Sequence, residues 1–270
     1  MNIKEALNGQ TSIFVKRRRT FTLVFLCVAT VFVISSSTVN FDTSGGLAAI
    51  PRAAVWIANN LVPTEASFRR LPTILNRLQE TILVSVAVTV CATIVAFFVS
   101  LLGTKALKVN PWIQKTVRMV AAIFRNIPDV VWAMILIFSF GQNILTGFFA
   151  LFFATFGMLT RIFIETIDEV SAACVEALHA TGANNMQIVF QGIIPSSVAE
   201  IVSWVLYMIE TNIRSSTVIG VLTGTGIGAL FNLYYSRFDF GAASLVVISL
   251  IVSVVAIETI SNQIRKVIIQ

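Results

Sequence analysis

Charged side chains within long apolar stretches are the residues of this sequence best placed to do chemistry. Glu210 and Arg214 lie four residues apart in the apolar stretch 198–220, so a helix would put them on one face, where they can pair. In a bilayer each such charge costs about 2.5–3.5 kcal/mol and therefore usually faces protein or water. The pair has two interpretations: it neutralises itself and holds helices together, or Arg214 lines a polar pathway and offers its planar fork to phosphate-like oxygens.

Two further pairs repeat this spacing. Arg125 and Asp129 lie on either side of Pro128, and Arg161 and Glu165 follow in the next apolar stretch. A proline in a spanning helix breaks one backbone hydrogen bond and permits a kink. Pro128 therefore predicts a kink near one membrane face, with a direct gate as the alternative. Arg161 and Glu165 are predicted to be interfacial.

Residues for catalysis, metal binding or ATP hydrolysis are scarce. The chain has one histidine, His179, which we expect on the surface, and three cysteines whose spacing is neither CxxC nor typical of zinc sites. The sequence contains no Gly-x-x-x-x-Gly-Lys-Ser/Thr phosphate loop. We therefore predict no catalytic residue, no metal site and no cofactor bound by this chain, and any energy from ATP must come from a separate subunit.

The elements that position these residues are predicted to be membrane-spanning helices. The 270 residues are 56% hydrophobic and 12% charged, whereas average soluble domains carry about 25% charged residues. A spanning helix needs about 20 mostly apolar residues. Six such stretches predict an all-α, polytopic membrane protein with six transmembrane helices: 20–39, 80–102, 119–140, 143–165, 198–220 and 241–262.

The basic residues predict the orientation of these helices. Lys16 to Arg19 directly precede the first stretch, a cluster that includes Lys108 lies between the second and third, and Arg265 and Lys266 follow the last. The positive-inside rule places all three clusters, and so both termini, in the cytoplasm. The net charge of +6 then reflects topology, since no interleaved basic and aromatic patch indicates nucleic-acid binding. A cleaved signal peptide is the alternative for the first stretch.

Residues 40–79 form the longest predicted external segment. Apolar residues within 47–57 favour a short amphipathic helix at the membrane interface. Arg69, Arg70 and Arg77 make the segment basic. We expect these arginines to contact lipid headgroups, or alternatively to dock an external partner or attract an anion.

Residues 166–197, between the fourth and fifth stretches, are predicted to be helical but not transmembrane. Gly182 can end a first helix in the left-handed conformation, and Asn184 or Asn185 can cap a second. Pro195 then fits the first turn of the fifth stretch, where it loses no hydrogen bond. Two short exposed helices with a bend suit docking into a groove of another protein, although a plain connecting loop satisfies the same physics.

The residues of this segment resemble the coupling motif of ABC importer permeases, which reads Glu-Ala-Ala, three residues, Gly, nine residues, Ile-x-Leu-Pro. The positions that carry the resemblance are Glu176, Ala177, Gly182, Ile194 and Pro195. Leu178 replaces the second Ala, Gly192 replaces the first Ile, and Ile194 replaces Leu. The resemblance implies that this coupling segment, about 168–195, inserts into a cleft of an ATPase subunit.

A second stretch resembles the phosphonate-importer permeases. Residues 207–220 contain a Glu-x-Asn-Ile-Arg-x-x-Thr-Val-Ile-Gly run, similar to that family's Glu-x-Asn-Ile-Arg-x-x-Thr-Val-Leu-Gly. Gly224, Gly226 and Gly228 are similar to its glycine-rich turn, with two threonines where glycines are expected, and residues 125–129 are similar to its Arg-x-Ile-Pro-Glu. After a membrane helix these glycines predict a hinge or re-entrant turn, or else an ordinary external turn.

The resemblance covers about residues 75–265 and implies a type I ABC importer permease, with a core domain at 80–270 after an N-terminal segment, 1–79, that holds the first span and the external segment. It implies a homodimer, two cytoplasmic ATPase subunits that bind ATP and magnesium, and an external substrate-binding protein, in lipid of the cytoplasmic membrane of a prokaryote. The chain would translocate a phosphonate or a related phosphorus oxyanion by alternating access. The residues predicted to line or gate the pathway are Arg214, Glu210, Asn212, Thr217, Gly224, Gly226, Gly228, Arg125 and Pro128.

Other functions stay open. Within the same class the substrate could be phosphite, phosphate, methionine or a quaternary amine. A stand-alone ion-coupled carrier would need buried titratable residues that form a relay. An intramembrane enzyme would need a catalytic cluster, which a single histidine and the lack of a zinc or dyad motif disfavour.

Overall fold

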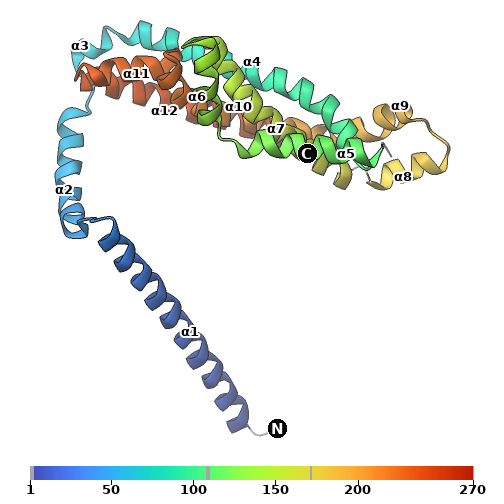
Figure 1. The fold of residues 1–270 in the computed structure, drawn as a ribbon, viewed down its shortest axis with the longest axis horizontal. Coiled ribbons are helices and arrows are strands. Elements are labelled where there is room, and N and C mark those ends of the chain that lie inside the picture. The colour runs from blue at the N-terminus through green and yellow to red at the C-terminus, as the bar shows by residue number, and fades with distance from the viewer. Residues whose placement is uncertain (1–2, 108–109, 171, 270) are drawn as a thin grey trace. The chain divides into compact units, whose positions relative to one another are not determined.

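The structure is a computed structural model that describes residues 3–107, 110–170 and 172–269. Lys108 of the predicted cytoplasmic cluster and Ser171 of the predicted coupling segment lie outside the described residues. The chain divides into two compact units, Met1–Asn59 and Asn60–Gln270. Both are built from helices in their described parts (Figure 1).

The first unit consists of α1 (Ile3–Thr38) and α2 (Thr43–Asn60). α1 is one uninterrupted helix whose segment Lys16–Thr38 is long and apolar enough to cross a membrane, in agreement with the predicted first span. α2 is the helix predicted within the external segment, and none of its side chains is buried. An apolar helix with Arg52 as its one charged residue suits the boundary between lipid and water.

Asp42 fixes the start of α2. Its Oδ1 accepts hydrogen bonds from the backbone N–H of Gly45 at 2.9 Å and from the hydroxyl of Ser44 at 2.8 Å. These bonds, that of Gly45 first, lower the pKa of Asp42 below its ordinary value. The cap therefore stabilises α2 fully above the ordinary pKa of an aspartate, and this contribution is lost as the pH falls through the lowered pKa.

The second unit is a bundle of long helices with short helices at its two ends. In Figure 1, α4, α7, α10 and α12 run along the bundle, and α8 and α9 lie at the end opposite α3. Its elements are α3 (Glu65–Phe68), α4 (Leu71–Gly103), α5 (Pro111–Asn126), α6 (Asp129–Phe140), α7 (Ile144–Val170), α8 (Ala172–Ala180), α9 (Asn185–Gln187), a π-helix (Ile188–Ile193), α10 (Ile194–Thr223), α11 (Gly226–Ser236) and α12 (Phe240–Ile269).

α7 is the centre of this bundle, because it packs against α4, α5, α6 and α10. More than half of its most apolar segment is buried, a larger share than in any other long helix of the described chain. Phe163 of α7 is fully buried in a cluster with Ala92 and Ala96 of α4 and Met208 of α10. Small residues such as these alanines let neighbouring helices approach closely, which is how helices associate in lipid.

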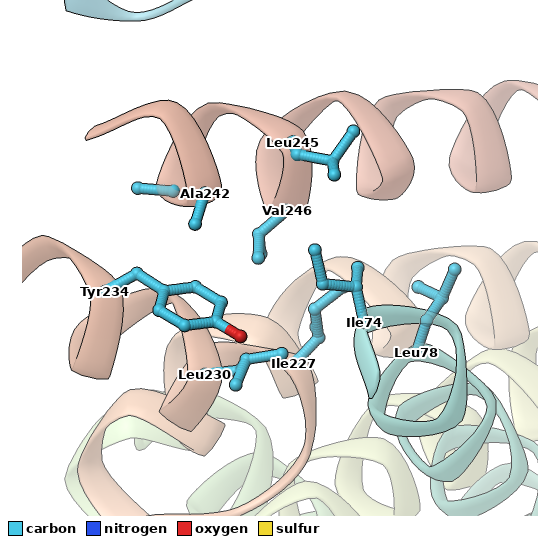
Figure 2. Packing of buried hydrophobic residues seen from close by; sticks show 9 residues of the cluster. Ile74, Leu78, Ile227, Leu230, Tyr234, Ala242, Leu245 and Val246 are labelled. Atoms are coloured by element: carbon cyan, nitrogen blue, oxygen red, sulfur yellow. The ribbon is translucent and has the colours of Figure 1, made fainter. Parts of the chain in front are cut away.

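A second apolar cluster joins α4, α11 and α12. In Figure 2, Ile74 of α4 lies beside Ile227 of α11, and Leu78 of α4 belongs to the same cluster. Tyr234 of α11 and Val246 of α12 belong to the same cluster. The short helix α11 is therefore packed into the bundle, so the glycine-rich stretch before it leads into buried structure and not into an exposed loop.

The predicted third span, 119–140, is not one straight helix. α5 ends at Asn126, α6 begins at Asp129, and the two are bent by 88°. Pro128 has no N–H and holds Ile127 in an extended conformation (φ −90°, ψ 118°), so the helix cannot continue. The kink predicted at Pro128 is confirmed as a break. The described residues hold five helices long and apolar enough to cross a membrane, or six if α5 and α6 count as one broken span.

Aromatic side chains hold the two sides of this break together. The indole Nε1 of Trp132 in α6 donates a hydrogen bond of 3.4 Å to the carbonyl of Phe124, near the end of α5, where carbonyls lack helical partners. The two rings stack with their centroids 5.3 Å apart. Gly157 lets α7 approach the same place, since a Cβ there would lie 2.6 Å from the backbone nitrogen of Arg125.

Candidate functional site

The coupling segment begins with the end of α7 and with α8, which Gly182 terminates. Gly182 has a φ of +81°, which confirms the predicted left-handed cap. The N–H groups of Gly182 and Ala183 donate to the carbonyls of His179 and Leu178, both at 3.1 Å, and so satisfy the end of the helix. A Cβ at position 182 would meet no atom within 4 Å, so the glycine serves the backbone conformation and not close packing.

Asn184 starts the second short helix, as predicted. Its Oδ1 accepts a hydrogen bond from the N–H of Gln187, and Oε1 of Gln187 accepts one from the N–H of Asn184, both at 2.9 Å. After α9 the chain continues through the π-helix directly into α10. No signal in the sequence predicted this wider turn. Pro195 lies in the first turn of α10, as predicted.

One face of α8 is packed and the other is open. Val175 is buried in a cluster with Ile188 and Ile193 of the π-helix. Glu176 and Ala177, the first two residues of the motif, are exposed. The motif residues are therefore accessible to another protein, on a helix that is held in place by its apolar face.

The two departures from the motif in the middle of the segment contact each other. A Cβ on Gly192 would lie 2.9 Å from Cδ1 of Leu178. The motif has a small residue at the position of Leu178 and a large one at that of Gly192, and this chain reverses the sizes. The two departures thus compensate, because the large side chain now comes from α8 and fills the space from the other side.

Asp168 anchors the base of the segment, a role that was not predicted. Its Oδ1 accepts hydrogen bonds from the N–H of Lys105, at 2.8 Å, and from the hydroxyl of Thr104. Its Oδ2 lies 2.8 Å from Nη2 of Arg118. One carboxylate therefore ties the end of α7 to the end of α4 and to α5. The basic run between α4 and α5 favours an acidic partner, but the sequence does not indicate which acidic residue faces it.

We expect Asp168→Ala to loosen this anchor and lower the stability of the second unit by about 1–2 kcal/mol, since three charge-assisted contacts are lost at a partly exposed site. Hydrogen exchange should rise in Lys105 and in α8 more than in α12. Glu165→Ala is the matched control on the same helix, because its exposed pair with Arg161 should contribute less than about 0.5 kcal/mol. Equal stability of the two variants would contradict the anchoring role.

His179 lies beside this anchor and is half-buried, so it is less exposed than predicted. Its Nε2 lies 3.2 Å from the carbonyl oxygen of Ala106. It lines a cavity of about 450 Å³ together with Lys105, Asp168 and Glu176. The contact holds α8 against the link that follows α4.

The predicted pair of Glu210 and Arg214 is present in α10. Nη1 of Arg214 lies 2.9 Å from Oε1 of Glu210. Arg265 of α12 was not predicted to take part, yet its Nη2 lies 3.7 Å from Oε2 of the same carboxylate. In the sequence Arg265 indicates only the topology, and nothing in its own neighbourhood points to α10.

The other two predicted pairs differ from each other. Arg161 and Glu165 form an exposed ion pair at 2.7 Å. No ion pair between Arg125 and Asp129 is found in the described chain, because the break at Pro128 puts them on different helices. Asp129 instead accepts a hydrogen bond from the N–H of Val130, at 2.9 Å, at the start of α6.

Arg125 lies in the last turn of α5, and Pro128 lies in the break between α5 and α6. Arg125 lines a cavity of about 320 Å³ with Glu169, Glu200 and Trp204, between α5, α7 and α10. Its Nε is buried and has no hydrogen-bond partner among the described residues. Glu165 lines the same cavity, so Arg125 shares it with three acidic side chains. Nothing in the sequence predicted that these residues would lie together.

Asn212 is enclosed by neighbouring helices within a single chain. Its Nδ2 donates to the hydroxyls of Thr89 in α4 and Thr155 in α7, both at 2.9 Å. Its carbonyl oxygen accepts from the hydroxyl of Ser85, at 3.2 Å. Thr217 is half-buried, and its hydroxyl donates to the carbonyl of Ile213. Asn212 thus joins three long helices, whereas Arg214 is exposed on the same helix.

The glycines after α10 form the turn into α11. Gly224 and Gly226 have φ values of +71° and +59°, which residues with a Cβ adopt at a cost. A Cβ on Gly228 would overlap the carbonyl oxygen of Thr217, so α10 and α11 touch backbone to backbone. The turn is packed against α4, because the N–H of Ile227 donates to the hydroxyl of Thr81 at 2.8 Å, and α11 then continues along α4 beyond the end of α10.

Two of the three arginines in the predicted external patch have acidic partners. Arg70 pairs with Asp239, and its guanidinium lies 4.9 Å from the ring centroid of Tyr234. Arg77 lies 2.7 Å from Glu80. The contacts of Arg70 fix the start of α4 to the turn before α12, and both ion pairs reduce the positive charge available to an anion.

Comparisons with known proteins agree with this arrangement. Residues 96–270 match the family described as binding-protein-dependent transport system inner membrane component. HtxC of Stutzerimonas stutzeri, named as a putative phosphite transport system permease protein, is 28% identical over 222 residues, which are 82% of this chain and 78% of that protein. PhnE2 of Escherichia coli (strain K12), named as a putative cryptic phosphonate transport system permease protein, is 32% identical over 117 residues, 43% of this chain and 96% of that protein.

A solved structure shows the same fold. It is titled as inward-facing conformations of the MetNI methionine ABC transporter, and it matches with a TM-score of 0.65 and 18% identity. The match covers 76% of this chain and 99% of that one.

Proposed function

Because the chain belongs to the family of binding-protein-dependent transport system inner membrane components, we propose that it is the membrane-spanning subunit of an ATP-driven importer for phosphonates and related phosphorus oxyanions. The observation that carries the proposal is the coupling segment, two capped short helices that present Glu176 and Ala177 to another protein. The phosphite and phosphonate names of the two relatives support the substrate class.

The proposed assembly follows from what one chain lacks. A second copy supplies the other half of the pathway, and two ATPase subunits that bind ATP and magnesium contact the coupling segments. A substrate-binding protein delivers the oxyanion from outside. The coupling segment and both termini lie in the cytoplasm, since that orientation keeps the basic clusters inside.

The connections of the coupling segment support alternating access. The π-helix runs without interruption into α10, so a push on α8 and α9 reaches the helix that carries Glu210 and Arg214. Asp168 transfers the same movement to the ends of α4 and α5. Closure of the ATPase pair would then reorient α4, α7 and α10 around the pathway as a group.

The direct test is reconstitution with the neighbouring ATPase and binding protein. We expect the tagged chain to copurify with the ATPase, and a phosphonate-loaded binding protein to stimulate ATP hydrolysis in lipid. Stimulation by methionine or a quaternary amine alone would retain the importer and reject the substrate. Failure of the folded chain to associate with any ATPase would favour a stand-alone carrier.

Glu176→Lys should uncouple the importer without unfolding this subunit. Glu176 is exposed, and among the described residues it forms no ion pair, so the reversed charge acts mainly on the partner and not on the fold. We expect binding to the ATPase to weaken by roughly 30-fold, the size of a typical interface hot spot. Glu65→Lys, an exposed charge in α3, is the control and should transport normally. Wild-type transport by folded Glu176→Lys would refute the coupling role.

A further inference from the structure

The charge cluster of α10 and α12 contains two cations and one anion. Glu210 is shared by Arg214, at 2.9 Å, and Arg265, at 3.7 Å. Its side chain is 10% exposed, so the carboxylate is enclosed between the two guanidinium groups. The cluster therefore has a net charge of +1.

Arg265 is incompletely satisfied by the protein. Within the described residues, its Nε and Nη2 are buried and have no hydrogen-bond partner. At 3.7 Å, the approach of Nη2 to Glu210 is an ion pair but is too long for a good hydrogen bond. Buried donors of this kind indicate that an acceptor belongs nearby.

Arg214 supplies the accessible side of the cluster. About half of its side chain is exposed, 48%, although one of its nitrogens is held by Glu210. Tyr207 and Val218 are exposed on the same helix, seven and four residues away. Arg214 therefore lies in an open strip of α10, from which a solute can reach its remaining donors.

We propose that Arg214 and Arg265 form a subsite for a phosphorus oxyanion, and that Glu210 is a counter-ion that the oxyanion displaces. A tetrahedral oxyanion presents several acceptors and matches two planar forks better than one carboxylate does. Glu210 lowers the charge of the empty subsite from +2 to +1 and weakens binding, which a transport pathway needs so that the ion can leave. This proposal rests on the proposed function. It adds Arg265 to the residues that bind the substrate.

The phosphate of an anionic lipid has the same chemistry as a free phosphonate, so the test must separate the two sources. The probe is methylphosphonate, titrated at constant ionic strength into the full chain in nanodiscs of phosphatidylcholine. Thermal unfolding reports binding, because a ligand of the folded state raises the melting temperature. A parallel set of nanodiscs contains phosphatidylglycerol.

Arg265→Gln should weaken methylphosphonate binding by roughly 10- to 100-fold, as expected for lost charge-assisted hydrogen bonds. Glu210→Gln should strengthen binding, since it removes the competing carboxylate. Lys266→Gln, an exposed charge one residue along α12, should bind like the wild type. A purely structural ion pair predicts instead that both cluster variants lose stability and that neither changes the dependence on methylphosphonate.

Three outcomes would overturn the subsite: no methylphosphonate dependence in the wild type, the same dependence in Arg265→Gln, or weaker binding by Glu210→Gln. A stabilisation by phosphatidylglycerol that needs Arg265, without one by methylphosphonate, would assign the two arginines to lipid and reject the substrate. Transport by the full complex keeps the two proposals apart. If the wild-type complex imports methylphosphonate and Arg265→Gln does so with unchanged KM and kcat, the function stands and the subsite fails.

Discussion

Replacing Gly228 with alanine is expected to abolish the folded second unit. The new Cβ would overlap the carbonyl oxygen of Thr217 and lie 2.7 Å from the backbone nitrogen of Val221. Both atoms belong to the backbone of α10, which cannot rotate aside as a side chain can. α11 would have to move away and leave the cluster it forms with α4 and α12. Overpacking typically costs 1–3 kcal/mol, so we expect at least about 3 kcal/mol where only backbone can yield.

The measurement is the melting temperature of the purified chain, followed by size-exclusion chromatography in detergent. Gly147→Ala is the matched control, a buried helical glycine whose Cβ would meet its nearest neighbour, Cγ2 of Ile219, at an ordinary 3.5 Å. It should be neutral or slightly stabilising, because alanine favours the helix by up to about 1 kcal/mol. A Gly228→Ala protein that melts like the wild type would show that α10 and α11 do not touch in this way.

Replacing Asn212 with alanine should cost about 2 kcal/mol and weaken the contact between α4, α7 and α10. The change removes the two bonds that Nδ2 donates to Thr89 and Thr155 and the one that Oδ1 accepts from Thr155. Hydrogen bonds between membrane helices average about 0.6 kcal/mol, and three of them give most of the expected loss. The threonine hydroxyls that remain behind are buried, which adds a desolvation cost.

Asn232→Ala, an exposed asparagine in α11, is the control and should leave stability unchanged. The same experiment separates the two possible roles of Asn212. A residue that only lines the pathway would alter transport in Asn212→Ala while the melting temperature stays the same. A residue that joins helices lowers the melting temperature whether or not substrate is present.

The features that local sequence determines were predictable. Spanning helices follow from runs of apolar residues, and the caps at Gly182 and Asn184 depend on residue types within one turn. The break at Pro128 was visible as a kink because proline acts on its immediate neighbours. The angle between α5 and α6 was not predictable from the sequence, because it depends on the hydrogen bond from Trp132 of α6 to Phe124 of α5.

Contacts between distant segments were not predictable from one sequence. Arg265 and Glu210 are 55 positions apart by their numbering, and Asp168 meets Lys105 from 63 positions away. Such pairs become neighbours only when two helices pack in a particular register, and helical periodicity does not determine that register. The pathway roles of Thr217, Gly224 and Gly226 stay predictions, because they depend on how a second chain packs against this one.

The reversed sizes of Leu178 and Gly192 have a consequence for how this segment evolves. A chimera that restored only the usual isoleucine at 192 would force it into the space of Leu178, and one that restored only the usual alanine at 178 would leave a void beside Gly192. Either single step passes through a less stable intermediate, so the two positions are epistatic. A comparison that scores each motif position independently would count two mismatches at 178 and 192. In the structure the two positions together keep the same space filled, with the large side chain at 178 and none at 192.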